Sequence, residues 1–345
     1  MKKFNVAIVG ATGMVGRTLI KVLEERRFPF AQLKLLASSR SANTKIETAS
    51  GVYTVEEAVP EAFAGVDLAF FSAGGTVSKN LAPEAVKRGA VVVDNSSAFR
   101  LEKDVPLVVP EVNPDALAGH NGIIANPNCS TIQLVVALQP LQKAAGLKRV
   151  VVSSYQAVSG AGKAALDELM AQSRAILDGK KDFPRERFPH AKAKVQHQMA
   201  FNMVPQIDVF ADNDYTKEEM KIILETRKIL SLPALKITST TVRVPVFNGH
   251  SESVNVEFER PLSAAEAREV LRHAPGIVVI DDPSELAYPM PVEIDGRDEV
   301  FVGRIRQDDS VPYGINMWVV ADNIRKGAAT NSVQIAETLI DRGLL

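Results

Sequence analysis

The sequence predicts an α/β protein of two domains, in which a parallel sheet is followed by an α+β domain on a mainly antiparallel sheet. As far as residue 125, short apolar and β-branched runs alternate with helical patterns, which is typical of parallel strands buried on both faces. Beyond residue 147, several strand-like runs alternate apolar with polar residues, as strands with one covered face do. A chain of 345 residues also exceeds what a single hydrophobic core usually holds.

The composition argues against several classes of protein. Hydrophobic residues make up 46% of the chain, charged residues 23%, and the net charge is -1 without a block of one sign, so we expect neither a nucleic-acid nor a membrane partner. The opening residues lead straight into a strand and lack signal-peptide character, which favours a cytoplasmic protein. The single cysteine excludes an intrachain disulfide and a cysteine-rich metal site, and we expect no metal.

A glycine-rich turn marks the start of the first domain. A strand over residues 4–9 is followed by Gly10, Gly13 and Gly16 and then by an amphipathic helical run. Glycines let such a turn close and let backbone N–H groups approach a pyrophosphate at the helix N-terminus. The spacing differs from the commoner Gly-x-Gly-x-x-Gly. Its place between a strand and a helix nevertheless predicts a Rossmann-like dinucleotide-binding domain rather than a plain tight turn.

The end of the next strand, residues 33–37, bears on the choice of cofactor. An NAD site usually carries Asp or Glu there to hold the ribose hydroxyls, whereas this chain has Ser38, Arg40 and Ser41. A guanidinium flanked by hydroxyls suits a 2′-phosphate, so we expect NADP. The alternative is an arginine that is simply solvated.

Polar turns follow the later strands, which are expected over residues 66–71, 91–93, 107–109 and 123–125. Arg100 ends a Ser/Asn-rich turn suited to an anion, and Cys129 follows the last strand. Ligands bind beyond the carboxyl ends of the strands in open α/β sheets. We therefore expect the glycine turn, Arg40, Arg100 and Cys129 to share one edge. A surface arginine without a partner is the alternative for Arg100.

Cys129 lies on a strand-to-helix turn. Asn126, Pro127 and Asn128 interrupt the apolar run, and after Ser130 apolar residues recur at three- and four-residue spacings. The first turn of a helix favours a thiolate, which is the nucleophilic form of cysteine. A lone cysteine is otherwise most often a small buried core residue. The anion-binding residues expected around Cys129 favour the catalytic interpretation.

The second half of the chain carries the expected antiparallel sheet and a long loop. Strands are expected over residues 149–156, 236–244, 253–258, 300–305 and 315–320, and helices over residues 163–178, 216–230, 262–273 and 328–342. The last helix is expected to pack on the first domain. The first domain would then comprise residues 1–129 and 326–345, and the second domain residues 130–325. Residues 180–215, with several prolines and mixed charge, indicate a functional or partner-binding loop.

Five polar residues of this half are candidates for a site. Gln156 ends a strand, Glu218 and Lys221 share a helix face, and Arg243 lies on the strand face opposite to its apolar neighbours. His250 lies in a turn. Taken singly, Glu218 and Lys221 would be a solvated ion pair, and His250 would be an exposed histidine without a role.

These motifs together resemble those of the aspartate-β-semialdehyde dehydrogenases over nearly the whole chain. The resemblance rests on Gly-Ala-Thr-Gly-Met-Val-Gly at 10–16, Ser-Ser-Arg-Ser at 38–41, Asn-Ser-Ser-Ala-Phe-Arg at 95–100, Asn-Pro-Asn-Cys-Ser-Thr at 126–131, Tyr-Gln-Ala-Val-Ser-Gly-Ala-Gly at 155–162, Glu-Glu-Met-Lys at 218–221 and Arg-Val-Pro-Val-Phe-Asn-Gly-His at 243–250. The Asn-Pro-Asn-Cys turn and the interval from Arg243 to His250 are the most specific of these.

The resemblance implies a role for each candidate. Cys129 would be the nucleophile, His250 the general acid/base, and Gln156 would orient the acyl-enzyme. Arg243 would hold the substrate α-carboxylate and Glu218 its α-amino group. The other substrate and phosphate contacts implied are Arg100, Lys221, Asn95 and Asn128. The implied NADP contacts are Gly10, Thr12, Gly13, Met14, Val15, Ser38, Arg40, Ser41, Ser159, Gly160 and Asn323.

The reaction implied converts L-aspartyl 4-phosphate, NADPH and a proton into L-aspartate 4-semialdehyde, phosphate and NADP. It would feed the synthesis of lysine and diaminopimelate, threonine, methionine and isoleucine, and the resemblance also implies a homodimer in contact through the second sheet. Three alternatives stay open. They are an N-acetyl-γ-glutamyl-phosphate reductase, which would not need Glu218, a phosphorylating glyceraldehyde-3-phosphate dehydrogenase, and a non-catalytic dinucleotide-binding regulator.

Overall fold

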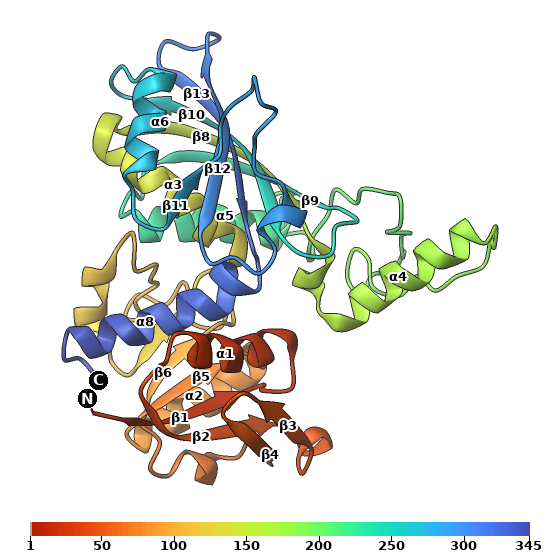
Figure 1. Ribbon diagram of the computed structural model, residues 1–345, viewed down its shortest axis with the longest axis vertical. Helices are drawn as coiled ribbons and strands as arrows, with labels where there is room; N and C mark the ends of the chain where they lie inside the picture. Colours follow the sequence, from red (N-terminus) through yellow and green to blue (C-terminus); the bar gives the residue numbers. More distant parts are fainter. Residues whose placement is uncertain (1) are drawn as a thin grey trace. The chain divides into compact units, whose positions relative to one another are not determined.

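The computed structural model describes residues 2–345, and the chain divides into two compact units (Figure 1). The first unit comprises the chain up to Asn128 together with Gly327–Leu345, and the second comprises Cys129–Lys326. These boundaries lie one residue from the predicted ones. No helix in the described part of the chain is both long enough and apolar enough to cross a membrane.

The first unit is built on a seven-stranded sheet in the order β3-β4-β2-β1-β5-β6-β7. Its strands are β1 (Phe4–Val9), β2 (Phe30–Ala37), β3 (Lys45–Thr48), β4 (Gly51–Glu57), β5 (Leu68–Phe71), β6 (Val91–Asp94) and β7 (Ile123–Ala125). All neighbours pair in parallel except β3 and β4, which form an antiparallel hairpin. The helices are α1 (Met14–Glu25), α2 (Gly75–Lys87) and α8 (Thr330–Asp341), with short 3-10 segments at Ser39–Ser41, Pro60–Phe63 and Pro114–Gly119.

Alternate side chains of the parallel strands build a core on each face of this sheet. On β1, Val6 and Ile8 pack with apolar residues of α1 and α8, whereas Ala7 and Val9 pack with those of α2. Burial on both faces explains why these strands are continuously apolar in sequence. The last helix, α8, packs against α1 and so completes the core of the first unit.

Two details of the first unit differ from the sequence prediction. The hairpin β3–β4 was not predicted, because most of its residues are exposed and polar or charged, so no apolar period marks it. Residues 107–109 were predicted as a strand, but they form only an isolated bridge from Leu107 to Ala125. Pro106 and Pro110 flank this segment, and a proline has no N–H group with which to extend the ladder.

The second unit contains a six-stranded sheet in the order β11-β12-β13-β10-β8-β9. Its strands are β8 (Leu147–Gln156), β9 (Lys236–Arg243), β10 (His250–Phe258), β11 (Ile277–Val279), β12 (Val300–Asp308) and β13 (Gly314–Ala321). The outer pairs β8–β9 and β11–β12 are parallel and the other three pairs are antiparallel. The helices are α3 (Cys129–Ala145), α4 (Lys163–Leu177), α5 (Lys217–Ile229), α6 (Ala264–Arg272) and α7 (Pro291–Ile294), and a π-helical segment, Arg325–Ala329, precedes α8.

The helix α3 is the central element of the second unit. It is buried around most of its circumference and contacts α5, α6 and four strands, β8, β10, β12 and β13. Figure 1 shows α3, α5 and α6 on the same side of this sheet. Since α3 begins at Cys129, the helix that fills the core also positions the thiol.

The other face of this sheet is largely open. Tyr155, Asn255, Asn316 and Trp318 point to this face and are only half-buried, while Ser253 is exposed. A cavity of about 310 Å³ opens here, lined by Ser253, Tyr288, Pro289, Met290, Pro291, Arg304, Arg306, Met317 and Trp318. The helices α3, α5 and α6 all lie on the opposite side of the sheet (Figure 1). They leave this face available for contact with another protein surface.

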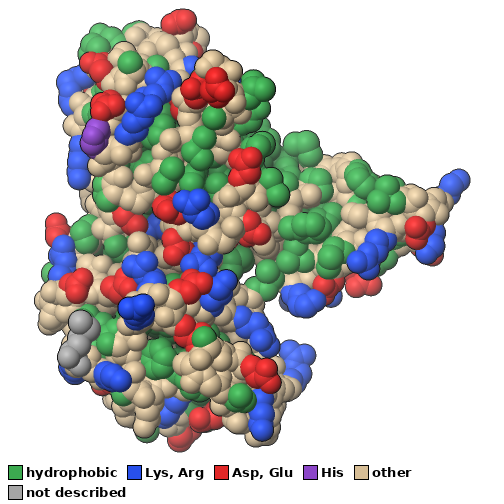
Figure 2. Space-filling view, in the orientation of Figure 1, with side chains coloured by type: hydrophobic (Ala, Val, Ile, Leu, Met, Phe, Trp, Pro, Cys, Tyr) green, Lys and Arg blue, Asp and Glu red, His purple; other side chains and the backbone are tan. Residues whose placement is uncertain are grey.

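The helix α4 and the residues after it form an arm of the second unit (Figure 1). The segment between Leu177 and Lys217 has no helix or strand, as predicted for the long loop. Buried Gln172 holds the loop, because its amide donates to the Pro184 carbonyl (2.8 Å) and accepts from the N–H groups of Met199 (2.8 Å) and Ala200 (3.0 Å). Figure 2 shows hydrophobic side chains gathered over this arm. The exposed ones include Met170, Leu177, Val195, Phe201 and Met203.

Candidate active site

The glycine turn of the first unit closes because two of its glycines leave no room for a side chain. Gly10 has φ of +88°, and a Cβ there would overlap the carbonyl oxygen of Ser72. At Gly16 a Cβ would overlap the carbonyl oxygen of Gly10. The helix α1 begins at Met14, and its N-cap residue Gly13 makes no side-chain capping bond. Bare backbone is therefore presented at a helix N-terminus, which is what a pyrophosphate site requires.

The turn after β2 lies beside the glycine turn, because β1 and β2 are parallel neighbours. Ser39–Ser41 form a single 3-10 turn that contains no acidic residue. Arg40 and Ser38 are exposed and Ser41 is half-buried. The turn thus presents a cation and hydroxyl groups at the edge where the carboxyl ends of the parallel strands meet.

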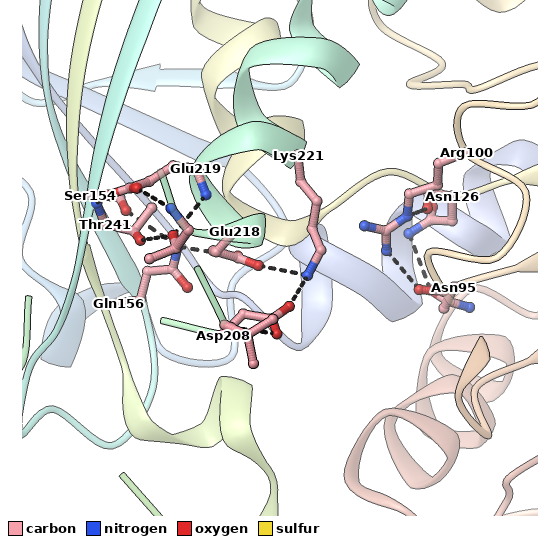
Figure 3. Close-up of polar contacts among 12 residues, drawn as sticks. Asn95, Arg100, Asn126, Ser154, Gln156, Asp208, Glu218, Glu219, Lys221 and Thr241 are labelled. Carbon is pink, nitrogen blue, oxygen red and sulfur yellow. Dashed lines mark hydrogen bonds and ion pairs between the residues drawn. The ribbon is translucent and has the colours of Figure 1, made fainter. Parts of the chain in front are cut away.

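Arg100 belongs to a polar network of the first unit, drawn in Figure 3. It is buried, and its guanidinium donates from Nε to the Asn126 carbonyl (3.0 Å) and from Nη2 to the Asn95 carbonyl (2.7 Å). The Asn126 amide donates to Asn95 Oδ1 (3.1 Å) and accepts from Asn331 of α8 (2.7 Å). These two bonds to backbone carbonyls fix the orientation of the guanidinium. Asn128, which ends the first unit, is also buried.

Cys129 and Arg243 interact in the second unit. The thiol is half-buried at the start of α3, and Arg243, only 5% exposed, ends β9. Burial lowers the pKa of Arg243, whereas negative charge on Glu218 and Cys129 raises it. An arginine stays cationic under such opposing influences. The Nη1 group donates to the Ala157 carbonyl (2.7 Å), which holds a positive charge near the sulfur.

A chain of contacts leads from Gln156 to Lys221 and is visible in Figure 3. The buried Gln156 amide donates to Ser154 Oγ (3.2 Å) and to Glu218 Oε1 (3.3 Å). The ammonium of Lys221 donates to Glu218 Oε2 (3.0 Å) and to Asp208 Oδ2 (3.0 Å). Burial lowers the pKa of Lys221, but the two carboxylates more than offset this effect and raise the pKa above its ordinary value. Glu218 and Lys221 are thus part of a network that runs from buried residues to partly exposed ones, rather than an isolated solvated pair.

His250 is fully buried at the start of β10 and is neutral. Burial, and then the charge of Arg243, lower its pKa from 6.5 to about 3, although Glu218 acts in the opposite direction. The N–H of Ala157 donates to Nδ1 (3.0 Å), so the proton of the neutral ring resides on Nε2. Nε2 makes no hydrogen bond to any residue of the described chain. This nitrogen is therefore a donor that is ready for a ligand.

Gly160 leaves the space in front of these two side chains open. A Cβ at this position would lie 3.1 Å from Arg243 Nη1 and 3.4 Å from His250 Nε2. The neighbouring Ser159 is buried and bonded to Asn323, whose Nδ2 donates to Ser159 Oγ (2.9 Å). Asn323 Oδ1 accepts from the N–H of Gly249 (2.9 Å). Asn323 thus connects the turn that contains Ser159 to the turn that precedes His250. Ser159 and Asn323 were both predicted as cofactor contacts.

The structure brings all six predicted catalytic and substrate residues of the second unit into one interacting group. Its members are Cys129, Gln156, Glu218, Lys221, Arg243 and His250. Of the other predicted residues, Ser159, Gly160 and Asn323 lie in turns of the second unit. The rest, from the glycine turn and Arg40 to Asn95 and Arg100, lie in turns after parallel strands of the first unit or at the start of α1. Asp208 was missed because it lies in the 180–215 loop, where no periodic pattern indicates which acidic residue turns inward. Within residues 2–345, no His, Cys, Asp and Glu side chains cluster as a metal site.

Comparisons with known proteins identify the family. The family model described as semialdehyde dehydrogenase, NAD binding domain, matches residues 5–120, and the semialdehyde dehydrogenase dimerisation domain matches residues 138–326. The chain is 56% identical to the aspartate-semialdehyde dehydrogenase of Aquifex aeolicus over 345 residues, which is 99% of each chain. The chain belongs to the aspartate-semialdehyde dehydrogenase family.

Other members of the family agree in sequence and in fold. The Bacillus subtilis aspartate-semialdehyde dehydrogenase is 55% identical over 336 residues, 97% of each chain. The crystal structure of aspartate semialdehyde dehydrogenase II from Vibrio cholerae matches with a TM-score of 0.93 at 48% identity, covering 99% of both chains. A second structure of that enzyme, described as complexed with ASA, has a TM-score of 0.92. Family membership makes the protein an oxidoreductase with a dinucleotide-binding domain, and it confirms the predicted two-domain α/β fold.

Gly160→Ala should lower activity while leaving the fold intact. The new methyl group would crowd Arg243 and His250, and the backbone of Gly160 is not left-handed, so alanine fits it without strain. We expect kcat/KM for aspartate semialdehyde to fall at least about tenfold, equivalent to about 1.4 kcal/mol. The stability in urea should be unchanged.

Gly162→Ala is the matched control in the same turn. Gly162 has φ of +90° and open space around it, so alanine there should cost about 1 kcal/mol of stability without blocking the site. Equal activity of Gly160→Ala and the parent enzyme would contradict the assignment of this space to a substrate.

The imidazole of His250 should not titrate near the ordinary histidine pKa. Its pKa of about 3 keeps the ring neutral, so its Cε1–H resonance should stay constant from about pH 5 to about pH 8 in proton NMR. Arg243→Met removes a repelling cation and should raise the pKa towards 6.5, whereas Arg149→Met, at an exposed arginine of β8, should not. A midpoint between pH 6 and 7 in the parent enzyme, roughly the unperturbed value, would refute this account of His250.

Proposed function

We propose that the protein catalyses the NADPH-dependent reductive dephosphorylation of L-aspartyl 4-phosphate to L-aspartate 4-semialdehyde through an acyl-thioester on Cys129. The observation that carries the proposal is the interaction of Cys129 with buried Arg243 beside neutral His250. The names of the most similar relatives support the same substrate.

The charges of the second unit suit an α-amino acid. An aspartyl group needs a cation for its α-carboxylate and an anion for its α-ammonium, held apart from each other. Arg243 supplies the cation and Glu218 supplies the anion, and each is fixed by neighbours, Arg243 by the Ala157 carbonyl and Glu218 by Gln156 and Lys221. An N-acylated substrate carries no ammonium and would leave the buried carboxylate of Glu218 without a cationic ligand group.

Lys221 is the candidate phosphate ligand of the second unit, and the first unit offers Arg100, with Asn95 and Asn128, as its own candidates. A phosphate dianion is best held by more than one cation. Lys221 already bonds Glu218 and Asp208, so phosphate has to compete with two carboxylates for the ammonium. The competition weakens phosphate binding and so favours its release after the acyl transfer.

Cys129 would attack the acyl carbon as a thiolate. The S–C bond forms, the C–O bond to phosphate breaks, and phosphate leaves with the bonding electron pair, which leaves a thioester. The cation of Arg243 and the helix N-terminus that begins at Cys129 both favour the thiolate. Backbone N–H groups of the first turn of α3 can stabilise the oxyanion that forms on the acyl oxygen.

His250 would act as a hydrogen-bond donor to the reacting oxygen. The tautomer with its proton on Nε2 supports donation, and Gly160 keeps the space in front of this nitrogen open. Hydrogen-bond donation would stabilise the tetrahedral oxyanion of each step. The first oxyanion collapses with loss of phosphate to the thioester, and the second, formed when the thioester is reduced, collapses with loss of the Cys129 thiolate and release of the aldehyde. Gln156, held by Ser154 and Glu218, would orient the acyl group.

The residues of the first unit suit a phosphorylated dinucleotide, which supplies the hydride when it is bound. The clash-free backbone at Gly10, Gly13 and Gly16 fits a pyrophosphate, with Thr12, Met14 and Val15 at the helix start. Arg40 with Ser38 and Ser41 would bind the 2′-phosphate. The candidate cofactor contacts of the second unit, taken by itself, are Gly160 and the hydrogen-bonded pair Ser159 and Asn323.

The protein would act as a homodimer through the open face of the second sheet. Half-buried Tyr155, Asn255, Asn316 and Trp318 lie on this face, and the region belongs to the part matched by the dimerisation-domain model. Two copies of this face packed against each other would cover these side chains. Such a contact has the two-fold symmetry that is commonest among homo-oligomers.

The proposed activity is tested in the phosphorolytic direction. Purified protein is given aspartate semialdehyde, phosphate and NADP, and we expect NADPH absorbance to increase in a phosphate-dependent manner. Cys129→Ser should abolish turnover and keep NADP binding, because the hydroxyl is a much weaker nucleophile. The absence of a signal, or an equal signal with N-acetylglutamate semialdehyde, would refute the proposed substrate.

Arg40→Ala should weaken the binding of NADP far more than that of NAD. An exposed guanidinium–phosphate contact contributes on the order of 1–3 kcal/mol, so we expect the KM for NADP to increase roughly tenfold or more. Lys45→Ala, at an exposed cation of the neighbouring strand β3, controls for the loss of positive charge. Equal losses for both cofactors would contradict the assignment of Arg40 to the 2′-phosphate.

A further inference from the structure

Two buried polar side chains, Glu252 and Gln133, lie beneath the catalytic residues of the second unit. Glu252 is 0% exposed and Gln133 is 1% exposed. Glu252 follows His250 by two residues on β10, so both point to the face covered by α3. Gln133 follows Cys129 by four residues on α3, so it lies one helical turn along the same side. The pair therefore connects the two elements that carry the thiol and the imidazole.

A third catalytic element also meets Glu252. In the register of β10 and β8, Glu252 pairs with Ser154. The Oγ of Ser154 accepts a hydrogen bond from Gln156 Nε2 (3.2 Å), and Gln156 lies two residues further along β8. Glu252 is thus at the junction of the segments that position Cys129, His250 and Gln156.

The polar atoms of the pair are complementary only when Glu252 carries a proton. The amide of Gln133 is close enough to influence the carboxyl of Glu252. The side-chain N and O atoms of both residues are buried and have no hydrogen-bond partner of standard geometry among the described residues. A carboxylate offers acceptors only, whereas a carboxylic acid offers an O–H donor and a carbonyl acceptor, and a primary amide offers two N–H donors and a carbonyl acceptor. A neutral acid can therefore satisfy both atoms of the amide at once.

The surroundings of Glu252 favour the neutral form. Burial raises its pKa well above the ordinary glutamate value, and Gln133 opposes this effect only in part. The residues paired with Glu252 on the two neighbouring strands are Ser154 of β8 and Val319 of β13, and neither is charged. The titratable or charged groups on the covered face or at the ends of the packed elements are His250, Cys129, Lys143 at the far end of α3, and Lys148 and Arg149 at the exposed start of β8. Tyr155 of β8 and Glu257 of β10 alternate with the covered positions and so point to the opposite face. None of these groups offsets the effect of burial on the pKa of Glu252.

We propose that Glu252 is a positioning residue of the active site, which acts as a neutral acid paired with the Gln133 amide and so holds Cys129 and His250 at a fixed separation. The roles of Cys129 and His250 in this proposal rest on the proposed function. The pairing itself does not, because it follows from the burial and the complementarity of the two side chains.

The protonation of Glu252 is tested by comparing the stability of Glu252→Gln with that of the parent protein as a function of pH. A carboxyl whose pKa is raised by folding stays protonated in the native state but ionises in the unfolded chain above about pH 4.5. Its contribution to stability is therefore present at low pH and is lost as pH rises. The Glu252→Gln variant has no such dependence, so the ratio of the two unfolding constants should grow by up to about tenfold per pH unit above that point.

Glu259→Gln, at an exposed position just beyond β10, controls for the change in net charge and should show a much flatter ratio. A ratio for Glu252→Gln that does not change between about pH 5 and about pH 8 would mean that Glu252 is ionised in the folded protein. That result would overturn the proposal.

The positioning role is tested by enzyme kinetics and by alkylation of Cys129 with iodoacetamide over a range of pH. Glu252→Met and Gln133→Met each remove the pairing. We expect kcat to fall about tenfold with KM within about twofold, and the pH midpoint of alkylation to move, because the misplaced groups act in the transition state. Glu252→Gln should rescue both readouts, since two amides are also complementary. The double variant should lose no more than either single variant.

A purely structural role would give a different result. Glu252→Met would then lower the melting temperature and leave kcat and the alkylation midpoint unchanged, which would overturn the positioning role. The outcome is also separable from the proposed function. A parent protein that is inactive on aspartate semialdehyde would refute that function, while the pH dependence of Glu252→Gln would still report on the acid–amide pair.

Discussion

The buried guanidinium of Arg243 is the charge on which the arrangement of the second unit depends. Removing a cation from water costs several kcal/mol unless neighbouring groups compensate it. Here the Ala157 carbonyl, Glu218 and Cys129 do so. Glu218 in turn is shared with Lys221, and Lys221 with Asp208, so the charges alternate from the buried arginine out to a carboxylate that is 36% exposed. One consequence is that His250 stays neutral beside a permanent cation. It is therefore suited to donate a hydrogen bond from Nε2–H rather than to accept a proton.

Ala157 shows why part of the site could not be predicted from the sequence. Its carbonyl accepts from Arg243 and its N–H donates to His250, so one residue orients the cation and sets the tautomer of the imidazole. Every residue carries these backbone groups, so no residue type signals the role. The position of Cys129 could be predicted, because an apolar strand, a proline turn and a helical period are all local patterns. The glycine turn could be predicted for the same reason. Asp208 could not, since its contact with Lys221 depends on the path of a loop without periodicity.

Glu252 is a different case, because the sequence did contain a signal for it. Val254, Val256 and Phe258 alternate along β10 and are all buried, so the two-residue period places His250 and Glu252 on the same covered face. A carboxyl at a core position of such a period indicates either a partner or a retained proton. The fold was predicted best where burial produces long apolar periods. It was missed at β3 and β4, where the strands are exposed, and overestimated at residues 107–109, where flanking prolines limit the ladder to one bridge.

The two carboxylates at Lys221 bear on how a reversible phosphorolysis could proceed. Two unit charges about 4 Å apart interact with about 4 kcal/mol at an effective dielectric constant near 20, so Glu218 and Asp208 strongly affect any anion that approaches this ammonium. A lysine without them would bind phosphate more tightly and would retain it beside the thioester. With them, the phosphate contact proposed for Lys221 is weak. In the proposed mechanism, a phosphate bound in this way would leave readily once the acyl group is on Cys129, so the same ammonium could serve for both the departure and the return of phosphate.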